Sequence, residues 1–390
     1  MDASLAPEDN VWISFGEFAA IALTSIRPRS LDGKHKKLKN EVNVVSLLKS
    51  ELPVLKQLLH EKYHTCGGFI VHDSYEEAIK YVAQLESAGK NQASYIYSID
   101  NRMQVQKLLN EVDDQNLRLM VNSLKSIPTR YHRSRYNLKT SNMIKDTWSK
   151  LIVGSHRVVK IEFYPHQRTK QLSVVLTING NEEKNEIVML GAHLDSKNQG
   201  DLKGGRAPGA DDNASGISLL TECLRVIIET NYKPNKTIQL VAFAAEEDGL
   251  IGSNEMAEDY SMRGIKVVGM LNLDMSGYKG SQKDIYFVQD FTNQPQNIFL
   301  EKLMDEYFIP TLTYGHSKCS YACSDHVSWY RMGFTASYAD ESSFEDRNKN
   351  MHTTSDTDVD QHHMKKFAQL SLAYLAELAK SSNEPYDKRL

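Results

Sequence analysis

Acidic and imidazole side chains follow three apolar stretches of this sequence, at the point where each stretch ends. The stretch EIVMLGAHLDS ends on His193 and Asp195. The stretch TIQLVAFAAEE ends on the adjacent pair Glu246 and Glu247, and VVGMLNLDM ends close to Asp274. Stretches of this length and composition predict buried strands. Because the carboxyl ends of neighbouring parallel strands meet at one edge of a sheet, these side chains are candidates for a common site.

Two further segments supply side chains of the same kinds. APGADDNASG places Asp211, Asp212 and Asn213 just ahead of a predicted helix, and NMHTTSDT places His352 ahead of the last one. Taken singly, each has a structural explanation, because Asp and Asn commonly cap helices and a lone histidine is usually a surface or core residue. Taken together, the carboxylates would repel one another and raise one another's pKa unless a cation neutralised them. The set therefore indicates a metal centre.

The donor types indicate which metal the centre would take. Imidazole nitrogen and carboxylate oxygen without thiolate suit zinc, with manganese or cobalt as substitutes. One catalytic zinc needs about three protein ligands, so this set is large enough for two metals that share a bridging carboxylate. Neighbouring residues of a strand point to opposite faces, so Glu246 and Glu247 should not be equivalent ligands. We expect one to bind metal and the other to act as a general base.

Bringing these side chains together requires a particular arrangement of elements. From residue 113 onward, apolar strands alternate with helices, including one at 214–231 and a closing helix at 364–381. Strands that are apolar on both faces and alternate with helices are typical of parallel sheets. We therefore predict an α/β fold in which a mainly parallel, mixed sheet is sandwiched by helices.

The first hundred residues have a different pattern. VWISFGEF and GGFIVHDS predict short strands, and VVSLLKSELPVLKQLLHEKYH and SYEEAIKYVAQLES predict helices, which together indicate a small α+β unit. The polar stretch Glu86 to Ser94 is a candidate connection. We divide the chain into an N-terminal unit at 1–95, a linker at 96–112 and a catalytic unit at 113–390.

Composition and charge exclude several classes of partner. The 390 residues carry a net charge of −4, whereas nucleic-acid binding needs a basic face. No apolar run reaches the roughly 18–20 residues of a membrane span. The apolar stretch Val11 to Ile26 is interrupted by Glu17 and lacks the basic flank of a signal peptide. We expect no nucleic-acid partner and no membrane partner.

The four cysteines are too few for a disulfide scaffold. Cys319 and Cys323 are separated by three residues in the loop YGHSKCSYACSDH, a spacing that permits a small disulfide, part of a metal site or two free thiols. No second Cys/His pair of zinc-finger spacing accompanies them, which favours the disulfide. Cys223 lies on the apolar side of a predicted helix and is expected to be inert packing. Cys66 has no assignment.

The motifs GAHLDS, APGADDNASG, AFAAEEDGLIGS, NLDMSGY, YACSDHVSW and HTTSDT give a more specific indication. In order and spacing, the sequence resembles the secreted bacterial leucyl aminopeptidases from about Gln115 to Lys380. These are two-zinc enzymes with one α/β domain, distantly similar to glutamate carboxypeptidase and glutaminyl cyclase. The N-terminal unit resembles the pro-region of that family at VWISFG and CGGFIVH. The resemblance implies a secreted zinc metallo-aminopeptidase, present as a zymogen that retains its pro-region and lacks its signal peptide.

The resemblance also implies two Zn²⁺ ions per chain and five ligands for them: His193, Asp212, Glu247, Asp274 and His352. Asp212 would bridge the two ions. Glu247 and His352 would complete one site, and the remaining two ligands the other.

Further roles follow from the same resemblance. Glu246 would be the general base, and Asp195 would orient the imidazole of His193. Cys319 and Cys323 would form the disulfide of the family. The peptide bond between the bridging aspartate and its successor would be cis.

The implied reaction removes the N-terminal residue from a peptide that has a free amino group. Zinc would lower the pKa of a bridging water from ~15.7 towards neutrality. Glu246 would take the proton of that water, and the resulting hydroxide would attack the scissile carbonyl. The implied partners are peptide substrates and the chain's own pro-region as an intramolecular inhibitor, and we expect a monomer.

Two other functions remain as alternatives. One is a glutaminyl cyclase-like enzyme with a single zinc, against which the complete set of bridged ligands argues. The other is an inactive binding module of the same fold. Such a module would be expected to have lost Glu246 or a ligand, and all of them are present in this sequence.

Leucine-preferring members of the family line their specificity pocket with apolar side chains. The matching positions here include four residues that keep this character: Met275, Tyr321, Phe344 and Met351. Asp340 falls where a phenylalanine is expected, and Tyr338 and Arg347 also depart from the pattern. In one interpretation, Asp340 selects an N-terminal Lys or Arg through a charge-assisted contact. In the other, it points to solvent or pairs with Arg347, and the preference stays with leucine and other hydrophobic residues.

Overall fold

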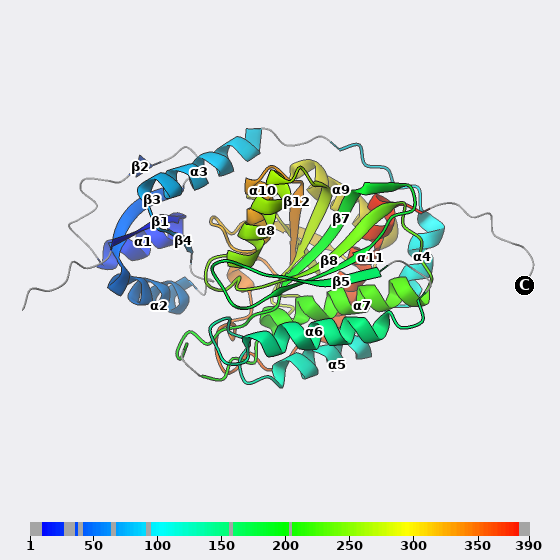
Figure 1. Cartoon of the computed structure of the whole chain (residues 1–390), viewed down its shortest axis with the longest axis horizontal. Helices are drawn as coiled ribbons and strands as arrows, with labels where there is room; N and C mark the ends of the chain where they lie inside the picture. Colours follow the sequence, from blue (N-terminus) through cyan, green and yellow to red (C-terminus); the bar gives the residue numbers. More distant parts are fainter. Residues whose placement is uncertain are drawn as a thin grey trace, which may run out of the picture.

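Two β-sheets, one small and one large, organise the chain in the computed structural model (Figure 1). The structure describes residues 10–26, 36–37, 42–63, 68–90, 95–155, 159–202 and 205–381. Cys66 lies outside these residues. Within the described ranges, no helix has both the length and the apolar character that crossing a bilayer requires.

The N-terminal unit is built on a four-stranded antiparallel sheet. In spatial order its strands are β2 (Lys36–Lys37), β3 (Asn43–Leu48), β1 (Asn10–Phe15) and β4 (Phe69–His72). Its helices are α1 (Glu17–Ile26), α2 (Leu52–Tyr63) and α3 (Tyr75–Lys90). Ile13 and Phe15 of β1 pack with Leu55 and Leu59 of α2 in a cluster of their own. The predicted small α+β unit is therefore present, and β4 is one edge of its sheet.

The large sheet has eight strands in the order β11-β10-β12-β9-β7-β8-β6-β5. Its central strands β12, β9, β7 and β8 run parallel, whereas β6 and β5 on one side and β10 on the other join by antiparallel pairing. The strand bounds are β5 (Val159–Tyr164), β6 (Ser173–Ile178), β7 (Glu183–His193), β8 (Lys236–Phe243), β9 (Lys266–Leu273), β10 (Ile285–Val288), β11 (Tyr314–Ser317) and β12 (Ala336–Asp340). The predicted mixed α/β sheet is confirmed.

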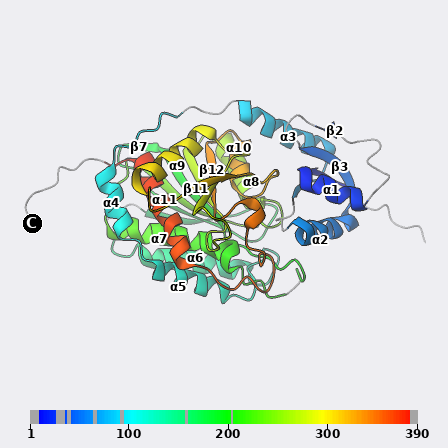
Figure 2. The same ribbon diagram turned by 180° about the vertical axis from the view of Figure 1, so that it is seen from behind.

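Helices cover both faces of this sheet (Figures 1 and 2). Their bounds are α4 (Arg102–Asn110), α5 (Asp114–Lys125), α6 (Asn137–Leu151), α7 (Gly216–Glu229), α8 (Ile251–Met262), α9 (Gln294–Tyr307), α10 (His326–Arg331) and α11 (Gln361–Ala379). Helices α7 and α11 pack on β7 and β8 from one side, and α8 and α10 lie on the other side.

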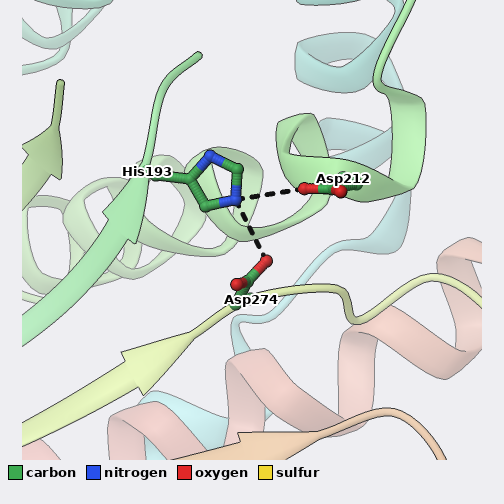
Figure 3. A group of neighbouring side chains, drawn as sticks. All are labelled: His193, Asp212 and Asp274. Carbon is green, nitrogen blue, oxygen red and sulfur yellow. Dashed lines mark hydrogen bonds and ion pairs between the residues drawn. The ribbon is translucent and has the colours of Figure 1, made fainter. Parts of the chain in front are cut away.

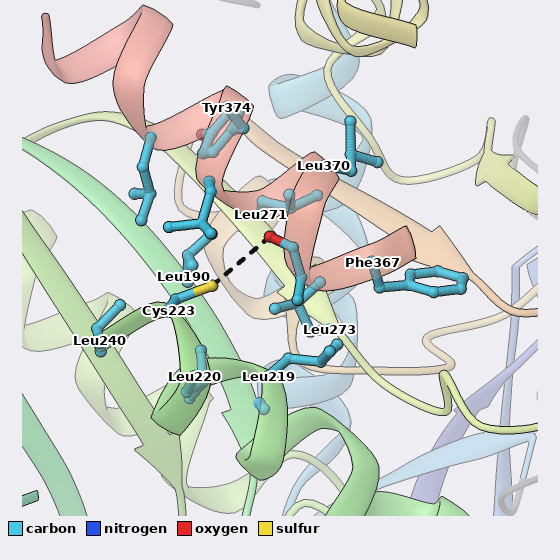
Figure 4. Packing of buried hydrophobic residues seen from close by; sticks show 14 of the residues in the cluster. Leu190, Leu219, Leu220, Cys223, Leu240, Leu271, Leu273, Phe367, Leu370 and Tyr374 are labelled. Carbon is cyan, nitrogen blue, oxygen red and sulfur yellow. Dashed lines mark hydrogen bonds between the residues drawn. The ribbon is translucent and has the colours of Figure 1, made fainter. Parts of the chain in front are cut away.

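Alternation along the central strands separates the two cores. In β7, Leu190 and Ala192 belong to the core beneath α7 and α11, whereas Met189 belongs to the core beneath α8 and α10. This follows from the pleat, which turns successive side chains to opposite faces. Figure 4 shows the first core, where Cys223 of α7 lies among leucines and donates to the carbonyl of Ala368. Cys223 is therefore a packing residue, as expected.

The segment after the N-terminal unit is fastened to α11 of the large unit. The backbone N–H groups of Asp100 and Asn101 donate to the buried carboxylate of Glu377. Helix α4, which falls inside the 96–112 range predicted as a linker, packs against α11 and contributes Val105 and Leu108 to the core. Most of that range therefore forms part of the large unit's packing, because its apolar residues recur at helical spacing.

Candidate metal centre

Three neighbouring strands deliver side chains to the same edge of the large sheet. Strand β7 ends at His193, and β9 ends one residue before Asp274. Strand β8, which runs parallel to β7, ends at Phe243, shortly before Glu246 and Glu247. All four side chains are buried. The parallel pairing of β7 with both β8 and β9 thus brings together residues that are up to 81 positions apart.

One group of ligand atoms forms around the ring of His193 (Figure 3). Nε2 of His193 lies 3.1 Å from Oδ1 of Asp212 and 3.2 Å from Oδ1 of Asp274. Each residue points one nitrogen or oxygen atom into the space between them, and these atoms all lie within 4.8 Å of one another. Such a group has the composition of a metal site.

A second group shares Asp212 with the first. Nε2 of His352 lies 3.0 Å from Oδ2 of Asp212 and 2.9 Å from Oε2 of Glu247. Asp212 therefore offers one carboxylate oxygen to each group. The structure brings together all five residues that the resemblance implies as ligands, in two groups that meet at Asp212.

The charges at this centre fit bound cations. Although burial opposes it, the carboxylates of Asp274 and Glu246 raise the pKa of His193 well above its usual value. Although burial raises it, hydrogen bonds from His193 and His352 bring the pKa of Asp212 well below its usual value. The buried carboxylates thus favour a positive charge on His193 when nothing else supplies it. Two metal ions would supply the same charge to neutral imidazoles, which are the form that binds metal.

Glu246 belongs to neither group among the described residues, although it is next to Glu247. Burial raises its pKa well above the usual value, and the carboxylates of Glu247 and Asp274 add to this effect, whereas His193 opposes it. Glu246 and Glu247 line one small cavity together with Ala322. A carboxylate beside the ligands, but not among them, and with a raised pKa is suited to accept and return a proton.

Asp195 contacts both His193 and the backbone of the glutamate pair. Its Oδ1 is 3.4 Å from Nδ1 of His193 and accepts a hydrogen bond of 3.0 Å from the N–H of Glu246. Its Oδ2 accepts from the N–H of Glu247 at 3.3 Å. One buried carboxylate therefore holds the imidazole and the two adjacent glutamates in a fixed relation.

The loop that carries Asp212 is held by two residues that the sequence analysis did not select. Arg130 is fully buried and donates to the backbone carbonyls of Leu194, Pro208 and Gly209, which brace the chain on both sides of the centre. Asp356 accepts from the N–H groups of Asp211 and Asp212. Asp356 stands in the HTTSDT motif, so the motif contained a signal, whereas Arg130 stands in no motif. The Asp212–Asn213 peptide bond is cis, as the resemblance implies.

Two more residues that the sequence analysis missed touch the ligands directly. Nζ of Lys197 is buried, 3.2 Å from Oε2 of Glu247 and 2.9 Å from its backbone oxygen. The hydroxyl of Ser324 donates to Oδ2 of Asp274 at 2.6 Å. Because Oδ1 of Asp274 faces His193, this bond leaves one carboxylate oxygen for a metal.

The residues expected to form the specificity pocket lie beside the centre. Cys319 and Cys323 form a disulfide, and the loop between them places Tyr321 edge-on against Phe344, with ring centres 5.9 Å apart. Tyr338 belongs to the same buried cluster. Met275 and Met351, which are next in sequence to Asp274 and His352, are also buried.

Asp340 has a counter-ion inside the protein. It is fully buried, and its Oδ2 lies 2.7 Å from Nη2 and 2.8 Å from Nε of Arg347. Of the interpretations given by the sequence, the structure matches the one in which Asp340 pairs with Arg347. The Lys/Arg interpretation needs this carboxylate to be available to the substrate, and that condition is not met here.

The N-terminal unit lies over the centre. The ring of His60 in α2 stacks on the ring of His352, with centres 5.6 Å apart and planes inclined by 28°. One helical turn earlier, Nζ of Lys56 lies 3.4 Å from Oδ1 of Asp248. Ile70 of β4 lines the small cavity that contains Glu246.

The fold and this histidine–carboxylate centre are those of a metallo-aminopeptidase. The chain belongs to peptidase family M28, whose family model matches residues 173–375. A probable leucine aminopeptidase of Trichophyton verrucosum is 34% identical over 300 residues, which cover 75% of this chain and 80% of that protein. A probable aminopeptidase of Saccharomyces cerevisiae is 31% identical over 294 residues, which cover 74% and 76% of the two chains.

The chain is also similar to solved structures of aminopeptidases. The LapA aminopeptidase of Legionella pneumophila is 27% identical with a TM-score of 0.77, over 95% of this chain and 98% of that one. LapB from the same organism is 26% identical with a TM-score of 0.78, over 95% and 100% of the two chains. Coverage this high includes most of the N-terminal unit. A glutaminyl cyclase of Bacteroides thetaiotaomicron, 16% identical with a TM-score of 0.55 over 68% of this chain and 98% of that one, shares the fold.

Proposed function

We propose that this protein is a two-zinc aminopeptidase in which Glu246 is the general base. The observation that carries the proposal is the pair of ligand groups that meet at Asp212, with Glu246 beside them but in neither. His193 and Asp274 would hold one zinc, and Glu247 and His352 the other. One zinc shared among five such ligands would leave several carboxylates unneutralised, which argues against a single-zinc cyclase.

In this proposal, Glu246 transfers a proton and Asp195 positions other residues of the site. When bound, the two zinc ions would polarise the scissile carbonyl and lower the pKa of a water. Glu246 accepts the proton from the attacking water and returns it to the nitrogen of the leaving amine. Asp195 fixes the backbone of Glu246 and the ring of His193, so that base and ligands keep their relative positions.

We further propose that the enzyme prefers a hydrophobic first residue. The expected pocket is walled by the rings of Tyr321 and Phe344 and by Met275 and Met351, all of them buried. Asp340, whose carboxylate would be needed to select Lys or Arg, already binds Arg347. The relatives named leucine aminopeptidases support the same preference.

The residues of the N-terminal unit that cover the centre support its role as an intramolecular inhibitor. In the intact chain, His60 of α2 stacks on His352, and Ile70 of β4 lines the cavity that contains Glu246. We also propose secretion, which the Cys319–Cys323 disulfide supports because such bonds persist in oxidising compartments. We also propose a monomer, because the five proposed ligands come together within one chain and no second copy is needed to complete the centre.

A metal count combined with kinetics on matched variants tests the function. We expect two zinc ions per chain, loss of activity on chelation, and recovery with zinc or cobalt. Glu246→Gln should keep both ions and lower kcat by ~10²–10⁴-fold, because a base is lost and no ligand is. Glu247→Gln, the same change one residue on, should lower the metal count. One ion per chain would favour the cyclase, and the reverse behaviour of the two variants would exchange their roles.

A further inference from the structure

A buried ion pair lies next to Phe344, one of the residues expected to form the specificity pocket. Asp340 is the last residue of β12, and Arg347 follows a short 3₁₀ turn at Phe344–Asp346. Their side chains are 0% and 2% exposed, and both Nε and Nη2 of the guanidinium lie within 2.8 Å of Oδ2 of Asp340. Each charge of this pair neutralises the other. Removal of one partner would leave an uncompensated charge in the protein interior.

The ion pair lies between the pocket wall and the metal centre. The guanidinium of Arg347 lies 4.5 Å from the ring centre of Phe344, which packs against Tyr321. Nη2 of Arg347 also donates to the hydroxyl of Tyr338 at 2.8 Å, and that hydroxyl donates to the backbone oxygen of Asp274 at 2.9 Å. One hydroxyl group therefore separates Arg347 from a proposed ligand residue. If the first residue of a substrate packs on Phe344 and Tyr321, the end of a long side chain lies close to the guanidinium that faces Phe344.

We infer that Arg347 determines which first residue the enzyme accepts, because it neutralises Asp340 and so keeps the end of the pocket closed to Lys and Arg. The inference rests on the proposed function and names the substrate class of the same site. A hydrophobic side chain packs on Phe344 and Tyr321 and leaves the ion pair intact. A lysyl ammonium would lose its water and meet the guanidinium, a like charge, without a free acid to bind. Without Arg347, the same carboxylate would favour the ammonium.

The wild-type enzyme provides the first test, with two substrates that differ only in charge. Norleucyl and lysyl p-nitroanilides have side chains with the same four-carbon stem, and only lysine carries an ammonium group. For the metal-loaded full-length enzyme, we expect kcat/KM to be at least ~10-fold higher for the norleucyl substrate, which corresponds to about 1.4 kcal/mol. Equal values, or a preference for lysine, would overturn the inference and leave the proposed function in place.

Variants provide the second test. Arg347→Met should raise the lysyl-to-norleucyl ratio of kcat/KM by ~10–100-fold, because Asp340 is then free for the substrate. Asp340→Asn combined with Arg347→Met should return the ratio to the wild-type range, and Arg347→Lys should keep it there because a cation still faces Asp340. Lys349→Met is the matched control, since this lysine of the same loop is exposed and its Nζ donates to the backbone carbonyl of Glu345.

The outcomes separate the specificity role from a structural one. Loss of loop structure would lower kcat/KM for both substrates equally, whereas a charge effect changes their ratio. An unchanged ratio in folded Arg347→Met would overturn the inference. If Arg347→Met does not fold, the inference stands or falls on the comparison of norleucyl and lysyl substrates in the wild type. If the metal-loaded wild type hydrolyses neither anilide, the proposed function fails, and the inference fails with it.

Discussion

Glu246, Glu247 and Asp248 are consecutive in the chain but have three different environments. Burial and neighbouring carboxylates raise the pKa of Glu246. Glu247, although buried beside Asp212, has a lowered pKa because His352 and Lys197 face it. Asp248, although buried, has a pKa well below its usual value because it accepts from His132 and lies near Lys56. The three adjacent acids therefore differ in pKa because each is turned towards different neighbours, as the proposed roles of Glu246 as proton acceptor and Glu247 as metal ligand require.

Asp284 shows how one carboxylate can connect several elements. It accepts from the backbone N–H and hydroxyl of Thr313, which leads into β11, and from Lys366 of α11 and Lys279. Although partial burial opposes it, these bonds, those from Lys366 and Thr313 above all, hold the pKa of Asp284 below its ordinary value. The carboxylate therefore stabilises the fold in its ionised form.

The pH dependence of stability tests this connection. Because the folded pKa of Asp284 lies below the unfolded one, its contribution is complete above about pH 4 and is lost as the pH falls further. For the metal-free proteins, Asp284→Asn should lower the free energy of unfolding by about 1–3 kcal/mol at pH 7, and the difference should shrink below pH 4. Urea unfolding measured between pH 3 and pH 7 checks this. Asp358→Asn, which removes an exposed acid, is the control, and a difference independent of pH would contradict the explanation.

At the scale of elements, one face of α2 covers the metal centre. Lys56 and His60 are four residues apart, so their side chains lie on the same side of the helix. Lys56 meets Asp248, and His60 stacks on His352. Both contacts join α2 to residues at or next to proposed ligands. If the N-terminal unit limits access to the site, as proposed, this face of α2 has to move away before a peptide can bind.

Loosening that face should raise the activity of the intact chain. We expect Lys56→Met combined with His60→Ala to increase kcat/KM on leucyl p-nitroanilide by roughly two- to tenfold, because the lost contacts shift the equilibrium towards open molecules. Gln57→Ala is the matched control, because Gln57 is an exposed residue of the same helix. An effect of equal size in the control, or none in the double variant, would show that α2 does not limit access.

At the scale of the whole molecule, the two units share a hydrophobic core. Tyr81, Val82 and Leu85 of α3 belong to the same buried cluster as Trp329 and Tyr330 of α10. The guanidinium of Arg331 lies 4.8 Å from the ring centre of Tyr81, and its Nη1 donates to Gln84. The N-terminal unit is therefore held by packing as well as by the chain, and we expect that cutting the connection does not by itself release it.

A protease site inserted between Lys90 and Tyr95 tests whether packing holds the N-terminal unit in place after the chain is cut. After cleavage, we expect both pieces to elute together in size-exclusion chromatography and kcat/KM to stay within about twofold of the uncut value. Mild urea should separate the pieces and raise the activity. Gly16→Ala should make separation easier, because a Cβ atom at Gly16 would lie 1.9 Å from the backbone oxygen of Ser320. Spontaneous separation of the cut protein without that substitution would show that packing between the units is weak.

The sequence by itself determined the class of fold and the donors of the centre. Apolar strands that alternate with helices predict a parallel sheet, and the polar residues at the strand ends then fall at one edge. His193, Glu247 and Asp274 could be selected in this way because their positions follow from strand periodicity and strand direction. Strand periodicity and strand direction are local properties, so they can be read from the sequence without knowledge of the tertiary structure.

Only the tertiary structure decided the contacts between segments that no regular element connects. Arg130 braces the Asp212 loop from 78 residues away, and no periodicity marks it. The sequence left open whether Asp340 faces the substrate or Arg347, because six intervening residues can place the guanidinium in either position. The packing of Arg347 against Phe344 and Tyr338 settled it. Likewise, the position of α2 over His352 depends on apolar contacts between the two units. These contacts join residues far apart in the sequence and exist only once the shared core has formed.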